Sequence, residues 1–260
     1  MALRGTTRVP GDKSISHRAL LIGALAEGPV RITGLGDGQD NSASARVIEQ
    51  LGVRVERTAE ATIVHGVGLH GLQAPDAPLD CGNSGTTMRL LIGILAGQPF
   101  EVTLIGDESL SRRPMKRVLE PLAKMGLTLL DAKDGTYPPL RIRGQRPLKP
   151  LHYDSPIASA QVKSALLLAG LWAPEPTVVT EPAPSRDHTE RMLQYLGHPP
   201  QGQPIHVPGD LSSAAFLLGA ALMEPGSQIE IKDVGINPTR TGVLDALEAM
   251  GANLHIGSKR

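Results

Sequence analysis

The chain has 260 residues, and its 26 Lys and Arg residues balance 26 Asp and Glu residues, so the formal net charge is zero. A neutral chain with 2% aromatic residues has neither the basic surface nor the stacking side chains that nucleic-acid binding needs. A single cysteine excludes an internal disulfide and a thiolate zinc site, and the histidines form no close metal-binding pair. We therefore expect no bound metal and no nucleic-acid partner.

Membrane insertion and secretion are also disfavoured by the sequence. No apolar run reaches roughly 18 residues, the length that a membrane-spanning helix needs. The first residues, MALRG, lack the basic and then apolar layout of a secretory signal. We expect no membrane partner and a cytoplasmic location. Hydrophobic residues make up 40% of the chain and are mostly aliphatic, which predicts an aliphatic core.

The chain repeats itself. The tetrapeptide VPGD at 9–12 recurs at 207–210, and each copy is followed by an apolar stretch, at 17–26 and at 214–223. Helical patterns along the chain also end in the same way, with an apolar residue and then a glycine; these glycines are Gly52, Gly126, Gly197 and Gly251. We therefore predict four copies of one supersecondary unit.

The second unit shows the expected alternation of elements. We expect a capped turn at 82–86, an apolar helix at 88–95 and a strand at 101–105. A second helix follows at about 114–125, and two closing strands follow at 128–131 and 140–143. Ser111 is the expected cap of the second helix, and Gly126 follows its last turn. The order βαβαββ predicts an α/β fold with helices packed on sheets.

The third unit is shorter than the first two. The interval from Gly197 to Gly251 is shorter than the earlier intervals, and 198–204 (HPPQGQP) is a proline-rich tether with no room for two closing strands. The fourth unit ends at 258–260 before its own closing strands. We predict a boundary near 199–206, with three units before it and one incomplete unit after it.

Cationic residues accompany the loops that precede the expected helices. These loops are 11–18, 83–89, 111–114, 159–163 and 185–188. Helix caps explain single Ser, Asn or Gly residues, and surface solvation explains one basic loop. However, a helix N-terminus carries about half a positive charge, so several such loops meeting with Lys and Arg would bind a phosphate- and carboxylate-bearing substrate.

Three other patterns have simpler explanations. The segment 66–71 (GVGLHG) matches a dinucleotide fingerprint, but Pro75 and Pro78 follow where its helix must begin. The group at 185–188 (SRDH) contains the residue types of a hydrolase triad, but they are too close in sequence to form one. Cys81 has no neighbouring base, so it is expected to be a packing residue.

The motifs together resemble the 5-enolpyruvylshikimate-3-phosphate (EPSP) synthase family. They are VPGDKSISHR at 9–18, GNSGTTMR at 82–89, RPM at 113–115, SAQ at 159–161 and NPTRTG at 237–242. The resemblance implies transfer of the enolpyruvyl group of phosphoenolpyruvate to the 5-hydroxyl of shikimate 3-phosphate, with release of phosphate and without metal or organic cofactor. It also implies the inside-out α/β barrel fold of enolpyruvyl transferases, in which two lobes of three βαβαββ units each hold the substrates between them.

The resemblance also implies roles for individual residues. The expected shikimate 3-phosphate contacts are Lys13, Ser14, Arg18, Ser159, Ala160, Gln161, Ser185 and Arg186. Lys13 and Gln161 are expected to reach both ligands, and Lys13 is the expected catalytic residue. Asn83, Gly85 and Arg113 are expected to hold phosphoenolpyruvate. Glyphosate occupies the phosphoenolpyruvate site in this family, and Gly85 presents no steric bar to it.

The resemblance divides the chain into two lobes and leaves the second one unfinished. We expect 9–205 to form the first lobe, with its third unit shortened, and 1–8 with 206–260 to form an incomplete second lobe of one unit. The second lobe's acid and base residues are then absent, or supplied by self-association or a complementing chain. Apolar surface should be exposed at 217–222 and 243–250, which favours self-association.

Two other functions are considered. One is a non-catalytic module that binds shikimate 3-phosphate without turnover. The other is UDP-N-acetylglucosamine enolpyruvyl transferase, which is disfavoured because that family has asparagine where this chain has Ser14 and a reactive cysteine in the loop at 107–113.

Overall fold

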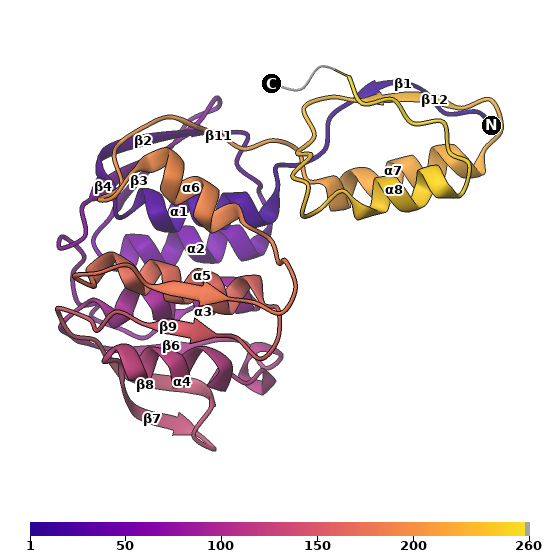
Figure 1. The fold of residues 1–260 in the computed structure, drawn as a ribbon. Helices are drawn as coiled ribbons and strands as arrows, with labels where there is room; N and C mark the ends of the chain where they lie inside the picture. The colour runs from indigo at the N-terminus through magenta and orange to yellow at the C-terminus, as the bar shows by residue number, and fades with distance from the viewer. Residues whose placement is uncertain (258–260) are drawn as a thin grey trace.

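The computed structural model describes residues 1–257 as two bodies that differ in size (Figure 1). The larger body contains the first three units, and the smaller body contains the fourth unit together with the N-terminal strand. The two bodies are joined where the chain crosses between them, at 8–12 and at 206–210. Within residues 1–257, no helix has both the length and the apolar character that a bilayer crossing requires.

The units follow one another along the chain. The first has α1 (Lys13–Gly23), β2 (Glu27–Thr33), α2 (Gln39–Gln50), β3 (Arg54–Arg57) and β4 (Thr62–Val67). The second has β5 (Leu79–Asp80), α3 (Gly85–Ala96), β6 (Glu101–Ile105), η1 (Leu110–Arg112), α4 (Lys116–Met125), β7 (Thr128–Lys133) and β8 (Tyr137–Arg143). The third has β9 (His152–Asp154), α5 (Ala160–Ala169), η2 (Gly170–Trp172), β10 (Val178–Thr180) and α6 (His188–Leu196). The remaining elements are β1 (Arg4–Thr7), β11 (Ile205–His206), α7 (Leu211–Met223), β12 (Gln228–Ile231) and α8 (Gly242–Ala249).

The sheets confirm the predicted repeat of βαβαββ units. Two four-stranded sheets have the orders β11-β2-β4-β3 and β5-β6-β8-β7. The strands β2, β4 and β3 of the first unit therefore occupy the same positions as β6, β8 and β7 of the second unit. In both, the first pair of strands is parallel and the other pairs are antiparallel. The equal topology shows that the internal sequence similarity reflects a repeated fold.

Most element boundaries of the second unit agree with the sequence. The strand at 101–105 is as expected, while α3 begins three residues before the predicted 88 because the Ser84 hydroxyl caps it. Ser111 is not the cap of α4, as was expected. It lies within η1, and α4 begins only at Lys116, after Met115 in a non-helical conformation.

The opening strands of two sheets are exchanged between the bodies. β11, at 205–206, pairs in parallel with β2 of the first unit, whereas the N-terminal β1 pairs in parallel with β12 of the fourth unit. At the crossing, the Asp12 amide donates to the Pro208 carbonyl at 2.7 Å and the Asp210 amide donates to the Pro10 carbonyl at 2.8 Å. The two VPGD segments of the internal repeat therefore lie side by side and antiparallel.

The third unit lacks the sheet of the first two. Its β9 and β10 form a two-stranded parallel sheet, and within the described residues no strand lies between α6 and β11. The tether instead runs along the first unit, where the Glu27 amide donates to the Pro200 carbonyl at 2.8 Å. Ile205 and Val207 both pack in the core of the larger body, so that core extends two residues past the predicted division at 205.

The core of the larger body is almost wholly aliphatic, as the composition predicted. The first helices of its three units pack together at its centre, and α3 approaches α5 so closely that a Cβ on Gly93 would lie 2.2 Å from the Ala165 carbonyl oxygen. Trp172 covers the end of α3 against Gly97. A glycine is needed at position 93 because any side chain there would separate the two helices.

The smaller body buries little of its apolar surface. Leu211, Ala214 and Leu244 form its core between α7, α8 and the β1–β12 sheet (Figure 1). Large side chains on the other faces of the helices are exposed: Phe216 by 83%, Met223 by 81% and Met250 by 82%. Leu217 and Leu222 are exposed as well, so the predicted apolar surface along these helices is confirmed.

Substitution of Gly93 by Ala is expected to destabilise the protein by about 1–3 kcal/mol, because the added methyl group meets the backbone of α5. Gly219→Ala in α7 is the matched control, since nothing lies within 4 Å of its added Cβ. The control should gain up to about 1 kcal/mol from helix propensity. Urea unfolding of both variants measures the difference, and equal stabilities would contradict the close packing of α3 on α5.

Candidate functional site at the helix N-termini

Four of the five predicted loops lie at the N-termini of α1, α3, α5 and α6, and the fifth, 111–114, overlaps η1. Hydrogen bonds connect the four helices α1, α3, α5 and α6. Three of them are capped by a side chain of the preceding residue. The caps are Asp12 to the Ile15 amide, Ser84 to the Thr87 amide and Ser159 to the Val162 amide. Capping explains why the predicted residues surround helix starts, where Lys13 and Ala160 are the first helical residues.

The N-terminus of α1 is surrounded by charged side chains. The Lys13 ammonium pairs with Asp40 at 3.1 Å, and the Lys13 amide donates to the Asp210 carboxylate at 3.2 Å. Arg186 donates to the Ser14 hydroxyl at 3.2 Å, which joins the loop before α6 to α1. Lys13, Ser14 and Arg186, three of the predicted substrate contacts, are therefore brought together from distant parts of the chain.

Arg18 is buried and bound by the protein itself. Its side chain donates to the Ser14 carbonyl at 2.8 Å, to the Ser164 hydroxyl at 2.8 Å and to the Thr189 hydroxyl at 2.6 Å. Burial lowers the Arg18 pKa to about 10, so the guanidinium is charged at neutral pH. Arg18 thus links α1, α5 and α6, and its role as a substrate contact stays a prediction.

Asn83 and Arg113 contact each other in front of α3. Arg113 donates to the Asn83 side-chain oxygen at 2.7 Å and to the Ser109 hydroxyl at 3.0 Å. The Asn83 amide group donates to Asp107 at 2.7 Å, which fixes which end of that side chain faces the arginine. The structure therefore brings two of the three predicted phosphoenolpyruvate residues into direct contact.

Gln161 and Gly85 complete the connection between α3 and α5. Gln161 accepts from Arg89 at 2.9 Å and donates to the Thr86 hydroxyl at 2.9 Å. A Cβ on Gly85 would lie 2.7 Å from an Arg89 nitrogen and 3.5 Å from an Arg113 nitrogen. Two guanidinium groups therefore lie close to the start of α3, and positive charge at a helix N-terminus suits an anion.

The loops before α5 and α6 meet at Glu181. Its carboxylate accepts from the Ser159 amide at 2.7 Å and from the Ser185 hydroxyl at 2.6 Å. Lys163 pairs with Glu181 and with Glu190, each at 2.8 Å. The cation of the 159–163 loop is therefore paired with two carboxylates inside the protein.

Residues that the sequence did not mark also belong to this region. Arg89 is the last residue of the motif GNSGTTMR at 82–89 and lies one helical turn after Gly85. That spacing could have indicated that Arg89 belongs to the site. Arg240 lies 3.1 Å from the Asp210 carboxylate and 3.7 Å from Asp12, so it bridges the caps of α7 and α1. Nothing local distinguished Glu181, which follows a short strand.

The patterns set aside in the sequence have structural explanations. Asp187 accepts from Asn237 at 2.6 Å and from Arg191 at 2.7 Å, so it holds the start of α6 and orients no histidine. Cys81 is fully buried, and burial raises its thiol pKa to about 12, which leaves it unreactive.

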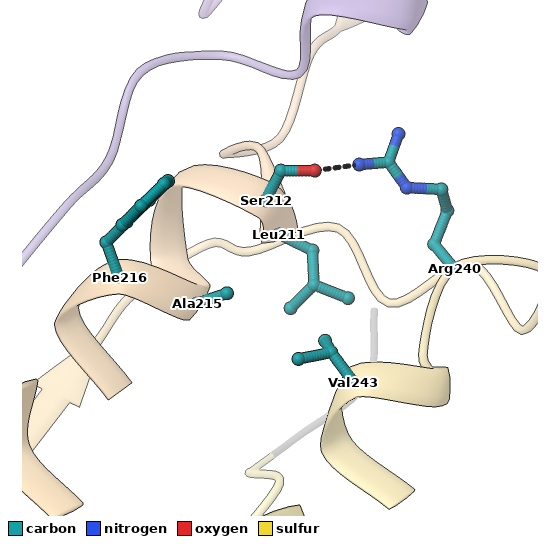
Figure 2. A pocket seen from close by; sticks show the side chains of 6 residues that line it. All are labelled: Leu211, Ser212, Ala215, Phe216, Arg240 and Val243. Carbon is teal, nitrogen blue, oxygen red and sulfur yellow. Dashed lines mark hydrogen bonds between the residues drawn. The ribbon is translucent and has the colours of Figure 1, made fainter. Parts of the chain in front are cut away.

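A hollow lies elsewhere, on the smaller body. It has a volume of about 460 Å³ and is lined by Leu211, Ser212, Ala215, Phe216, Arg240 and Val243 (Figure 2). Its lining is mostly apolar, and Figure 2 shows its polar edge where Arg240 reaches Ser212. None of the predicted substrate contacts lines this hollow. We therefore place the candidate site at the helix N-termini and not in the hollow.

Repeated βαβαββ units with anion-suited helix N-termini define an enolpyruvyl transferase fold. The family model of EPSP synthase (3-phosphoshikimate 1-carboxyvinyltransferase) matches residues 1–259, and the chain belongs to this family. The 3-phosphoshikimate 1-carboxyvinyltransferase of Alkalilimnicola ehrlichii is 54% identical and matches 100% of this chain but 61% of its own length. That of Halorhodospira halophila is also 54% identical over 98% of this chain and 61% of its own length.

A solved structure agrees with these sequence matches. EPSP synthase from Acinetobacter baumannii has a TM-score of 0.93 and 46% identity, covering 100% of this chain and 62% of that protein. The chain thus spans about three fifths of the length of the relatives that it matches.

The buried His17 predicts how stability changes with pH. Its ring bonds to the Ser44 hydroxyl at 2.8 Å, and burial lowers its pKa from 6.5 to about 3. Below pH 6.5 the unfolded chain takes up a proton that the folded protein does not, so the free energy of unfolding falls as pH falls from 6.5 toward 3, by a few kcal/mol. Urea unfolding at several pH values in this range should show that the free energy of unfolding depends less steeply on pH in His17→Gln than in the parent chain. An unchanged pH dependence would contradict the neutral buried ring.

Proposed function

We propose that this chain acts in the transfer of the enolpyruvyl group from phosphoenolpyruvate to the 5-hydroxyl of shikimate 3-phosphate, with release of phosphate. The observation that carries the proposal is the meeting of four helix N-termini with Lys13, Arg89, Arg113 and Arg186 at one connected site. Membership of the EPSP synthase family supports the choice of substrates.

The charges of the site fit this pair of substrates. Both substrates carry a phosphate and a carboxylate, so bringing them together is opposed by Coulombic repulsion and by the entropy of association. Arg186 and Lys13, with Ser14 between them, supply countercharge for shikimate 3-phosphate. The open backbone at Gly85, between two guanidinium groups, suits phosphoenolpyruvate. In this proposal glyphosate competes with phosphoenolpyruvate at the same place.

The division of labour between the two bodies is also part of the proposal. Residues 9–205, with a core that extends to Val207, form the substrate-binding lobe, and 1–8 with the rest of the described chain up to 257 form part of the second lobe. Separate hydrophobic cores in the two bodies support this division. In this proposal the acid and base groups of the reaction belong to the second lobe.

The reaction itself is tested by incubating the purified chain with both substrates and measuring phosphate release, with calorimetry of shikimate 3-phosphate binding in parallel. We expect binding and turnover, and turnover that rises with protein concentration would indicate completion by self-association. Binding without turnover at any concentration would instead identify a non-catalytic module. If shikimate 3-phosphate does not bind, the proposed function is wrong.

Arg113→Ala is expected to weaken phosphoenolpyruvate binding by about 10- to 100-fold, the loss of one charge-assisted contact, and to change shikimate 3-phosphate binding by less than about twofold. The matched control is Arg112→Ala, because that neighbouring guanidinium is exposed and pairs with Glu108. Fluorescence or calorimetric titration with each ligand separates the two effects. An equal loss for both ligands would show that Arg113 does not belong to the phosphoenolpyruvate side.

A further inference from the structure

Glu181 lies between the two loops that are expected to contact shikimate 3-phosphate. It follows β10, and its side chain is 7% exposed. One carboxylate oxygen accepts from the Ser159 amide and the other from the Ser185 hydroxyl, at 2.7 Å and 2.6 Å. A single side chain therefore holds the loop before α5 and the loop before α6 at a fixed separation.

The carboxylate is kept ionised by its partners. Burial acts to raise the Glu181 pKa, but hydrogen bonds from Lys163, Ser185 and the Ser159 amide outweigh burial and hold that pKa below its usual range. Lys163 is itself held by a second carboxylate, that of Glu190. If the hydrogen bond from the Ser185 hydroxyl were lost, the Glu181 carboxylate would still be paired with Lys163.

A buried negative charge beside a phosphate site is unfavourable for anion binding in itself. Arg18 and Arg186 bring positive charge to the same region, where Arg18 interacts with both Glu190 and Arg186. Electrostatics alone would nevertheless favour a neutral side chain at position 181. The carboxylate must therefore contribute through the positions of the groups that it holds.

We propose that Glu181 is a positioning residue, which holds the Ser159 and Ser185 loops at the separation that one phosphate group needs. This inference rests on the proposed function, because it assigns the loops to the phosphate of shikimate 3-phosphate. Glu181 itself does not touch the ligand. It acts through the direction of the Ser185 hydroxyl and the place of the Ser159 backbone, from which α5 begins.

Three variants separate positioning from charge. Glu181→Gln removes the charge and leaves one acceptor oxygen; if that oxygen keeps the Ser159 amide, the Ser185 hydroxyl can only accept from the new NH2 group and must turn round. Glu181→Asp keeps the charge but is too short to reach both loops. Glu190→Gln is the matched control, because it removes a carboxylate from the same Lys163 and contacts neither Ser159 nor Ser185. A positioning role predicts weaker binding of shikimate 3-phosphate in both Glu181 variants. A purely electrostatic role predicts tighter anion binding in Glu181→Gln and no change in Glu181→Asp.

The first measurement is calorimetric binding of shikimate 3-phosphate and of shikimate, which lacks the phosphate. We expect both Glu181 variants to bind shikimate 3-phosphate about tenfold more weakly, the order of one lost hydrogen bond to a charged group, and shikimate within about twofold of the parent. Glu190→Gln should bind shikimate 3-phosphate as tightly as the parent or more tightly. Equal losses for the two ligands, or tighter binding in Glu181→Gln, would overturn the proposal.

The second measurement needs no ligand and separates this inference from the proposed function. Hydrogen–deuterium exchange should rise in peptides covering 155–162 or 180–188 in the Glu181 variants and stay unchanged in Glu190→Gln. If the parent chain fails to bind shikimate 3-phosphate, the proposed function is wrong, and exchange still decides whether Glu181 orders the two loops. Unchanged exchange in all three variants would show that it does not.

Discussion

The antiparallel pairing of the two VPGD segments is the constraint on which the rest of the structure depends. Reciprocal backbone hydrogen bonds at Asp12 and Asp210 hold the two crossings of the chain together, and each aspartate also caps the helix that follows it. Arg240 joins the two carboxylates from the smaller body. As a result, α1 begins where the bodies meet, and Lys13 stands at that junction. The exchange of β1 and β11 between the sheets follows from the same crossing.

The electrostatics of the site depend on which cations the protein neutralises internally. Lys13 and Lys163 are paired with carboxylates, whereas Arg89, Arg113 and Arg186 donate to neutral amide and hydroxyl oxygens. Neutral partners fix the direction of a guanidinium without cancelling its charge. An incoming dianion therefore meets oriented arginines, and the lysines contribute mainly by holding loops in place until a ligand competes for them.

The sequence predicted those parts of the fold that depend on local signals. Alternation and glycine punctuation located β6 and the two strands after α4, because these elements carry their own pattern of residues. The exchanged strand β11 could not be predicted, since two residues carry no period and their partner β2 is distant in sequence. The same reason applies to the site. Arg113 and Gln161 stand in recognisable motifs, but Glu181 acquires its role only when α5 and α6 fold against each other.

The repeat also explains the contrast between the two bodies. α7 occupies the position in its unit that α3 occupies in the second, and both are strongly apolar helices. α3 is buried on nearly all sides by the equivalent helices of the neighbouring units, while α7 buries only Leu211 and Ala214 and exposes Phe216. A helix of this kind is stabilised chiefly by packing against its equivalents and less by its own propensity. The larger body has three such helices packed together and carries all the predicted substrate contacts. The larger body can therefore hold the predicted contacts in place by its own packing, whereas the smaller body leaves much of α7 exposed.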